Sequence, residues 1–371
     1  MQKKGQIRFT GTDNAIFFVT LRKRVEDYFR DNKISRNYNA AMVIKTIVLL
    51  TAYIAPFLLI IFLNPPFWIA LIGWFIMGLA IAGIGMSVMH DANHGSYTSN
   101  EKTNNFIGYA LNLLGGATCN WKFQHNQLHH TFTNIAGHDE DIDQKLGMRF
   151  NPHTKHYFFQ RLQFFYSFIF YGIVTLYWVT LKDFIQFGHY IHHGVNRNSP
   201  GKNAIMLLKI TLIKVIYFFC ILFVPMYFMH IPVHEVVLGF LLMHFVGGMI
   251  LSVVFQLAHT VEGTTHPLPD ENGNIENNWA IHQMNTTADF SRKSKLISWY
   301  VGGLNFQVEH HLFPRICHVH YPAISGIVKQ TAEECGVPYL ENETLGDALR
   351  SHLSLLHKLG RVPSLSELVA G

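Results

Sequence analysis

The stretch VHEVVLGFLLMHFVGGMILSVVFQLAHT, Val233–Thr260, joins a long apolar run to a histidine. About 20 consecutive apolar residues are needed to cross the hydrocarbon core of a bilayer as a helix. Residues 233–258 have that length and contain one charged side chain, Glu235. His259 follows directly, and histidine is the commonest metal ligand. The stretch therefore predicts a transmembrane helix with a candidate metal ligand at one end.

The composition extends this prediction to the whole chain. Of the 371 residues 49% are apolar and only 14% are charged, where a soluble domain has about a quarter charged; the mean hydropathy is +0.16. Three further segments have the length of a span, namely 41–63, 67–89 and 209–230. Together with 233–258 they form two hairpins. We therefore predict an all-α integral membrane protein with four transmembrane helices.

The distribution of Lys and Arg predicts the orientation. The turns LNPP (63–66) and MHIPVHE (229–235) contain neither residue, whereas the N-terminal segment, the loop 90–208 and the tail after 259 are rich in both. The positive-inside rule places both termini and the large loop in the cytoplasm. We expect a multi-pass membrane protein with a cytoplasmic helical cap. Because the basic residues cluster near apolar segments, the net charge of +5 gives no reason to expect a nucleic-acid partner.

Two apolar segments are not counted as spans. Residues 162–181 are flanked by Arg161 and Lys182, and a crossing there would put the histidines before and after them on opposite sides. We expect this segment to lie in the interface, as we do for the shorter segment 106–118. The predicted organisation is an interfacial amphipathic segment over 1–38, a membrane domain over 39–320 and a cytoplasmic helical tail over 321–371.

Histidine, with 23 residues, is the compositional outlier. Three clusters stand out: HDANH (90–94) after the second predicted span, HNQLHH (125–130) in the following loop, and QVEHH (307–311) after the fourth. Residues four apart share one face of a helix, whereas adjacent His129 and His130 point about 100° apart and could serve two metals. The predicted topology brings all the clusters to the cytoplasmic face. With His259 they supply eight candidate ligands: His90, His94, His125, His129, His130, His259, His310 and His311.

These donors favour iron. The pair His234–Glu235 lacks the second histidine of a zinc-protease HExxH motif, since position 238 is Leu. The four cysteines contain no CxxC pair. Eight imidazoles are too many for one metal and suit two. Cleaving an unactivated methylene C–H bond is beyond any side chain, so we expect two iron ions with O₂ as co-substrate, a membrane lipid as substrate and no separate acid or base residue.

Other residues are candidates with equally good structural explanations. Gln307 faces both His310 and His311 and could bind the metal or orient a ligand. Acidic residues near the clusters could orient ligands or form a solvated loop: Asp91, Asp139, Glu140, Asp141 and Asp143. Arg292, Lys293 and Lys295 could meet the phosphate of a substrate headgroup or be ordinary juxtamembrane charges. His189, His192 and His193 repeat the HxxHH spacing, but we expect interfacial or loop histidines there.

The three clusters resemble the histidine boxes of the membrane fatty acid desaturases in order, in spacing and in their relation to the spans, over residues 40–320. The context GGLNFQVEHHLFPRI (302–316) resembles the front-end group, which has Gln in place of the first histidine of the third box. The resemblance implies a cis double bond inserted into an acyl chain, between an existing double bond and the carboxyl end. It implies a Δ6- or Δ5-type reaction on a linoleoyl-like substrate, with His259 as a further iron ligand.

One feature departs from the family pattern. Many front-end enzymes carry a fused cytochrome b5 domain with an HPGG haem motif, which this sequence lacks. We therefore expect electrons from a separate ferredoxin, or from a free cytochrome b5 with its reductase, as in a bacterial linoleoyl-CoA-desaturase-like protein. The acyl carrier, CoA or phospholipid, is left open.

Two rival functions remain. A hydroxylase or other lipid oxygenase on the same scaffold would share every ligand. A histidine-rich membrane metal transporter is a different class, but transporters bind near the middle of the membrane, and these histidines gather at one face.

Overall fold

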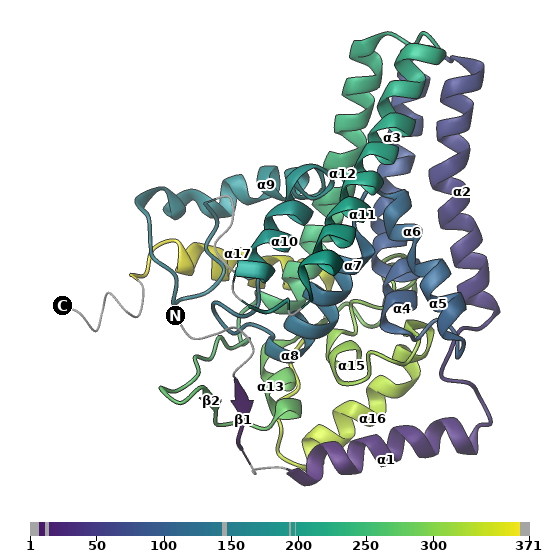
Figure 1. The fold of residues 1–371 in the computed structure, drawn as a ribbon. Coiled ribbons are helices and arrows are strands. Elements are labelled where there is room, and N and C mark those ends of the chain that lie inside the picture. Colours follow the sequence, from purple (N-terminus) through teal and green to yellow (C-terminus); the bar gives the residue numbers. More distant parts are fainter. Residues whose placement is uncertain (1–6, 12–14, 143–146, 193, 197, 364–371) are drawn as a thin grey trace. The chain divides into compact units, whose positions relative to one another are not determined.

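The computed structural model describes the whole chain except residues 1–6, 12–14, 143–146, 193, 197 and 364–371 (Figure 1). The chain separates into two compact units, which we call unit 1 (Met1–Asn37, Phe123–Phe168 and Val254–Gly371) and unit 2 (Tyr38–Lys122 and Ile169–Val253). The division falls inside three helices: η2 (Lys122–His129), α9 (Gln163–Tyr177) and α12 (Val233–His259).

Unit 2 holds most of the long apolar helices. Helix α2 (Ala40–Leu63) is capped at its start by Asn39, whose side chain accepts a hydrogen bond from Met42 N–H. It is followed by Asn64 in the left-handed conformation, which Asn tolerates better than most residues. Pro65 and Pro66 then turn the chain into α3, which lies beside α2. Besides parts of η2, α9 and α12, this unit contains the helices α2 (Ala40–Leu63), α3 (Phe67–Gly83), η1 (Ile84–Val88), α4 (Met89–His94), α5 (Glu101–Gly108), α6 (Ala110–Leu113), α7 (Thr118–Trp121), η4 (Trp178–Lys182), α10 (Asp183–His192), α11 (Pro200–Phe218) and η5 (Phe219–Phe228).

The long helices expose apolar side chains outward. Ile47, Phe62 and Trp68 are 60%, 70% and 74% exposed, which suits contact with lipid tails rather than water. Among the described residues five helical runs are long and apolar enough to span a membrane: Ala40–Leu63, Phe67–His94, Phe158–His192, Pro200–Phe228 and Val233–His259. The predicted helical membrane protein is confirmed, but the count of four spans is not, because the run we assigned to the interface also qualifies.

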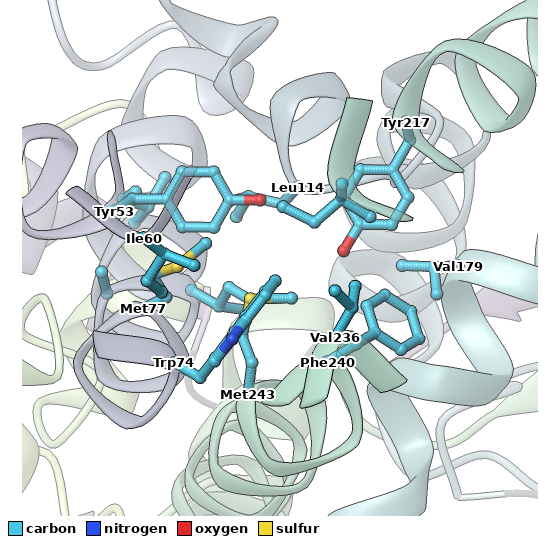
Figure 2. Packing of buried hydrophobic residues seen from close by; sticks show 14 of the residues in the cluster. Tyr53, Ile60, Trp74, Met77, Leu114, Val179, Tyr217, Val236, Phe240 and Met243 are labelled. Atoms are coloured by element: carbon cyan, nitrogen blue, oxygen red, sulfur yellow. The ribbon is translucent and has the colours of Figure 1, made fainter. Parts of the chain in front are cut away.

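The core of unit 2 lies between these helices. Trp74, Met77 and Met243 are almost fully buried and pack with the rings of Tyr217 and Phe240 (Figure 2). Helices approach closely where glycine allows it, as at Gly248, where a Cβ atom would lie 2.8 Å from the carbonyl oxygen of Tyr171. One ion pair is buried in the same unit: Lys214 Nζ lies 2.5 Å from Asp183 Oδ2.

Unit 1 contains shorter elements. Its members, besides the shared helices, are β1 (Arg8–Phe9), α1 (Ala15–Asp31), α8 (His130–Phe132), η3 (Phe158–Leu162), β2 (Asn274–Ile275), α13 (Trp279–Thr286), β3 (Asp289–Phe290), α14 (Lys295–Tyr300), α15 (Gln307–Leu312), η6 (His318–His320), α16 (Tyr321–Glu334), β4 (Glu341–Asn342) and α17 (Leu345–Leu359). The strands form two short parallel pairs, β1 with β2 and β3 with β4. In the second pair Asp289 faces Glu341 and Phe290 faces Asn342.

The predicted amphipathic helix near the N-terminus is present as α1, but its apolar stripe has a protein partner. Phe17, Leu21 and Val25 are buried in one cluster with residues of α13, α15 and α16, and α1 runs along α16 in Figure 1. Ile16, by contrast, is 75% exposed. The main apolar face of α1 thus stabilises unit 1, and contact of its outer face with a membrane remains a prediction. The predicted domain limits likewise remain predictions.

Candidate metal centre

Six of the eight candidate ligands lie in unit 1. His125 and His129 belong to η2 and His130 begins α8, while His259 ends α12 and the pair His310–His311 lies on α15. Among the described residues of this unit, two all-histidine groups have ring nitrogens within 4.8 Å of one another: His129, His259 and His311 form one, and His130, His310 and His311 form the other. All five are buried. Adjacent His129 and His130 thus belong to different groups, and the presence of two metals stays a prediction.

The second histidine cluster is a π-helix rather than an α-helix. In a π-helix, backbone hydrogen bonds join residues five apart, and such turns are frequent at functional sites. The wider turn brings His125 to His130, whose Nε2 atoms are 3.3 Å apart. His125 and His129 still stack, with ring centroids 5.2 Å apart. The sequence predicted the convergence of residues four apart but not the closer pair five apart.

The Nδ1 atoms of the ligand candidates are held by other protein groups. Asp139 Oδ2 lies 3.0 Å from Nδ1 of His129, and Gln283 Oε1 lies 2.7 Å from Nδ1 of His311. The Tyr321 hydroxyl lies 3.1 Å from Nδ1 of His310, and the Thr286 carbonyl oxygen lies 3.3 Å from Nδ1 of His259. Such outer partners fix the tautomer and ring orientation of metal-binding histidines. The Nε2 atoms of His129 and His311 are thereby left available for a metal.

The Nε2 atoms themselves support a metal. Those of His129 and His311 are buried and have no hydrogen-bond partner among the described residues. A buried polar atom without a partner costs about 1–3 kcal/mol. A cation placed within reach of both nitrogens would satisfy them. The donor set therefore fits a group that binds imidazole, as iron does.

The electrostatics keep one ring neutral and polarise another. Burial, followed by the nearby rings of His130 and His259, lowers the pKa of His311 well below its usual range, so this ring is neutral and able to bind a metal at pH 7. At His129 burial also disfavours the charged form, but the carboxylate of Asp139 more than offsets it and raises the pKa of the imidazole. Asp139 in turn is held ionised against its burial by His129, so its pKa is lowered.

Gln307 is the remaining polar group at this centre. Its side-chain Nε2 lies 2.9 Å from Nε2 of His259, and its Oε1 is buried without a hydrogen-bond partner in the described chain. The side chain is 3% exposed. The amide can therefore donate to His259, or, with its oxygen turned inward, approach a metal held by that ring.

The other two candidate ligands lie in unit 2. Helix α4 continues α3 and η1 and carries both His90 and His94. Their ring centroids are 4.7 Å apart, and the two rings pack against Trp121 at 5.6 and 5.7 Å. His90 and Asp91 are buried. His90 and His94 thus share one face of the helix, as predicted. Trp121 packs against both rings and orients them.

The chain is similar in sequence to a known family and to several known proteins. Residues 65–342 match the family model described as Fatty acid desaturase. A protein named sn-1 linoleoyl-lipid 6-desaturase from Synechocystis sp. is 32% identical over 95% of this chain and 98% of its own length. One of the same name from Arthrospira platensis is 33% identical, covering 94% and 93%. An acyl-lipid (8-3)-desaturase from Physcomitrium patens is 34% identical over 96% of this chain and 74% of its own length.

The chain belongs to the fatty acid desaturase family. It is an oxidoreductase, and the resemblance drawn from the three histidine clusters, including the front-end group, is confirmed. Membership of the family and the apolar helices together make the desaturase a multi-pass membrane protein.

The remaining candidate site residues that the structure describes lie outside the two histidine groups. Asp141 pairs with Gln124 and donates its backbone N–H to Asp139 at 3.0 Å, so it lies one step behind His129. His189 is half-buried and His192 exposed on α10, and no candidate metal group among the described residues includes them. Asp143 and His193 lie outside the described residues. Their predicted roles stay predictions.

The basic residues proposed for a substrate headgroup differ from one another. Arg292 donates to Glu341 at 2.9 Å and to the Tyr339 hydroxyl at 2.7 Å, so its guanidinium is engaged within the protein. Lys293 and Lys295 are exposed. A headgroup role for these residues stays a prediction.

Three residues at the candidate metal centre are not predicted by any pattern in the sequence. Gln283, Thr286 and Tyr321 hold the Nδ1 atoms of His311, His259 and His310. None stands at a metal-ligand spacing from a histidine cluster, and one of them acts through its backbone carbonyl. Only the tertiary fold brings them to the ligands.

Proposed function

We propose that the desaturase uses two irons to insert a cis double bond into the acyl chain of a membrane lipid. The observation that carries the metal assignment is the set of imidazoles whose ring nitrogens converge, with Nδ1 atoms held by outer protein groups. In this proposal His129, His259 and His311 bind one iron, and His130 and His310 bind the other, with His311 within reach of both groups. His125, His90 and His94 complete the ligand set that the family motifs imply.

The protein's own residues hold and shield the centre. Asp139, Gln283 and Tyr321 fix the ligand rings before any metal binds, so that little reorganisation is needed. Because the ring nitrogens are buried, bulk water does not reach them. When bound, the irons supply the activation of O₂ that removal of hydrogen from an unactivated methylene requires.

The electron balance requires an outside donor. Removing two hydrogens from the acyl chain supplies two of the four electrons that reduce O₂ to two waters. The other two electrons and two protons complete the balance. We propose that the electrons come from a ferredoxin or a free cytochrome b5 with its reductase, and that the protons come from water. The Lys- and Arg-rich segments support a centre that faces the cytoplasm, and we propose a bacterial inner membrane as its location.

The relatives support a lipid-linked substrate. Two of them, which match this chain over more than nine-tenths of both lengths, are named as linoleoyl-lipid 6-desaturases, whereas the moss relative is named as an acyl-lipid (8-3)-desaturase. We propose a linoleoyl chain on a glycerolipid, with the new double bond at the 6-position. A bond at the 5-position and an acyl-CoA substrate are the outcomes that the experiment must distinguish.

The test is product analysis in a host that contains linoleate and a ferredoxin or cytochrome b5 system. Fatty acids are released separately from lipids and from CoA esters and analysed by gas chromatography with double-bond-locating mass spectrometry. We expect a cis 6-double bond, in the lipid fraction first. His311→Ala should abolish the product, and His192→Ala, an exposed histidine outside the groups, should retain it. A hydroxy acid in place of the new double bond would contradict the proposal.

A further inference from the structure

The helix that carries His310 and His311 is capped from another segment. Helix α15 has six residues and starts at Gln307, after Phe306, whose side chain cannot cap it. The first N–H groups of a helix need acceptors outside the helix. Asp289 supplies one, since its Oδ1 accepts the N–H of Val308 at 3.0 Å. A residue eighteen positions before α15 thus fixes the start of the ligand helix.

The other oxygen of Asp289 is held by the C-terminal region. The Tyr339 hydroxyl donates to Asp289 Oδ2 at 2.6 Å and lies 3.0 Å from Glu309 Oε1, on α15 itself. Arg292 donates to the same hydroxyl at 2.7 Å, and its guanidinium lies 5.3 Å from the centre of the Tyr339 ring. One phenol therefore joins Asp289, Glu309 and Arg292.

Tyr339 is fixed by the chain around it. Glu341 accepts from Arg292 at 2.9 Å and from Lys329, on α16, at 3.1 Å. The backbone of Asp289 donates to the carbonyl oxygen of Leu340 at 2.9 Å, within the pairing of β3 with β4. Residues 339–342 are thus attached to the segment 288–292 by both backbone and side chains.

The same segment also reaches His259. The backbone N–H of Ala288 donates to the carbonyl oxygen of Ala258 at 2.9 Å, and the Thr286 carbonyl oxygen faces Nδ1 of His259 at 3.3 Å. Residues 286–289 therefore contact the end of α12 at one side and the start of α15 at the other. Their position sets the distance between two elements that carry ring nitrogens of one candidate metal group.

We propose that Asp289, Tyr339 and Arg292 are positioning residues that set the spacing between His259 and the His310–His311 pair. We call these three residues the brace. None of the three side chains is a candidate metal ligand. They act on the positions of the ligand histidines through α15 and the segment 286–289. The proposal rests on the metal centre proposed above, and it gives the C-terminal residues 339–342 a part in assembling that centre.

The test is Co²⁺ binding by the purified full chain, stripped of metal, in detergent micelles. The visible absorption of bound Co²⁺ reports the ligand geometry, and a titration gives the affinity. Tyr339→Phe keeps the ring and removes the hydroxyl. We expect about tenfold weaker Co²⁺ binding, in the range for outer partners of metal ligands, and a changed spectrum. Tyr28→Phe, at a half-buried tyrosine on α1, is the matched control and should bind as the unaltered chain does.

A second variant separates positioning from folding. Asp289→Asn retains one oxygen to accept the Val308 N–H but offers Tyr339 a poorer partner, so it should weaken Co²⁺ binding less than Asp289→Ala does. This graded order is the expected result whether or not Tyr339→Phe folds well. Binding and spectra equal to those of the unaltered chain in folded Tyr339→Phe or Asp289→Ala would overturn the brace. Failure of the unaltered chain to bind Co²⁺ would instead overturn the metal centre, and the brace with it.

Discussion

Gln283 accepts a hydrogen bond from Nδ1 of His311 across 2.7 Å. Its amide nitrogen donates to the carbonyl oxygen of His130 at 3.2 Å, and Thr133 donates to its oxygen at 2.9 Å. One buried amide therefore joins the second and third histidine clusters, which are 177 positions apart in the sequence when counted from His130 to Gln307. It fixes the ring of His311 and the backbone at His130 together.

Gln283→Leu should weaken metal binding by 10- to 100-fold, roughly the range for loss of an outer partner of a metal ligand. The leucine removes the nearest acceptor of Nδ1 of His311, which keeps only the Thr133 hydroxyl at 3.3 Å. It also removes one of two donors to the carbonyl oxygen of His130, which keeps Trp279 Nε1–H at 3.1 Å. Iron per protein, measured after purification at limiting iron, checks this expectation. Gln283→Glu keeps the acceptor for His311 and should lose less iron. Equal iron content in the Leu variant and the unaltered chain would refute the role.

Asp139→Asn should lower iron affinity by about tenfold. The carboxylate accepts from Nδ1 of His129 and from the backbone N–H of Asn134 at 3.0 Å each, and its charge makes the ring a stronger donor to a metal. The amide keeps the shape but loses the charge. Glu26→Gln, which removes an exposed ion pair with Arg22, is the matched control. An exposed pair contributes little, so iron binding should be unchanged there.

The sequence predicted the parts of this protein that repeat a simple period or spacing. The spans 41–63 and 233–258 correspond closely to α2 and α12, because a run of apolar residues is sufficient to form a helix in a membrane. Seven of the eight candidate histidines follow from spacing within the clusters, and His259 follows from its place at the end of a predicted span. The positions of six of them relative to one another needed the structure, since the π-helix over Lys122–His129 changes which rings meet.

Other features depend on tertiary contacts that no local pattern encodes. The run Phe158–His192 is long enough to span once its short helices join end to end, whereas the sequence showed an interrupted segment with charged flanks. The apolar stripe of α1 suits a membrane surface and a protein surface equally, and α16 provides the partner. The outer groups Gln283, Thr286 and Tyr321 came only from the fold.

The stability of the metal-free protein should fall as the pH drops from 6.5 to 4. His352 is buried on α17 and donates to the Thr260 carbonyl oxygen at 2.7 Å, and burial lowers the pKa of its ring to about 4. Below pH 6.5 the His352 ring binds a proton in the unfolded chain, but in the folded chain it binds one only near pH 4. The difference costs about 3 kcal/mol of unfolding free energy by pH 4.

His352→Gln isolates this contribution, since glutamine can donate to Thr260 but does not titrate. The slope of unfolding free energy against pH should become smaller by up to about 1.4 kcal/mol per pH unit between pH 6.5 and 4. Denaturant unfolding in mixed micelles at a series of pH values provides the measurement. Parallel curves for His352→Gln and the unaltered chain would contradict the prediction.

Lys214→Met should destabilise unit 2 strongly. The ammonium group donates to Asp183 Oδ2 at 2.5 Å, to the Gly115 carbonyl at 2.6 Å and to the Trp178 carbonyl at 2.9 Å, and Asp183 is almost fully buried. Removing one member of a buried ion pair leaves an uncompensated charge, at a cost of about 3–5 kcal/mol. We expect a drop of that size in the free energy of unfolding, measured in micelles at pH 7.

The double variant Lys214→Met with Asp183→Asn tests the cause of that loss. It removes both charges, while the asparagine oxygen can still accept the Ala117 N–H that Asp183 Oδ2 accepts at 3.0 Å. It should therefore recover a substantial part of the stability. Lys209→Met, at an exposed position of the same helix, is the control and should change the free energy of unfolding by less than about 0.5 kcal/mol. If Lys214→Met were as stable as Lys209→Met, the buried pair would not stabilise the fold, and its role would have to lie in function.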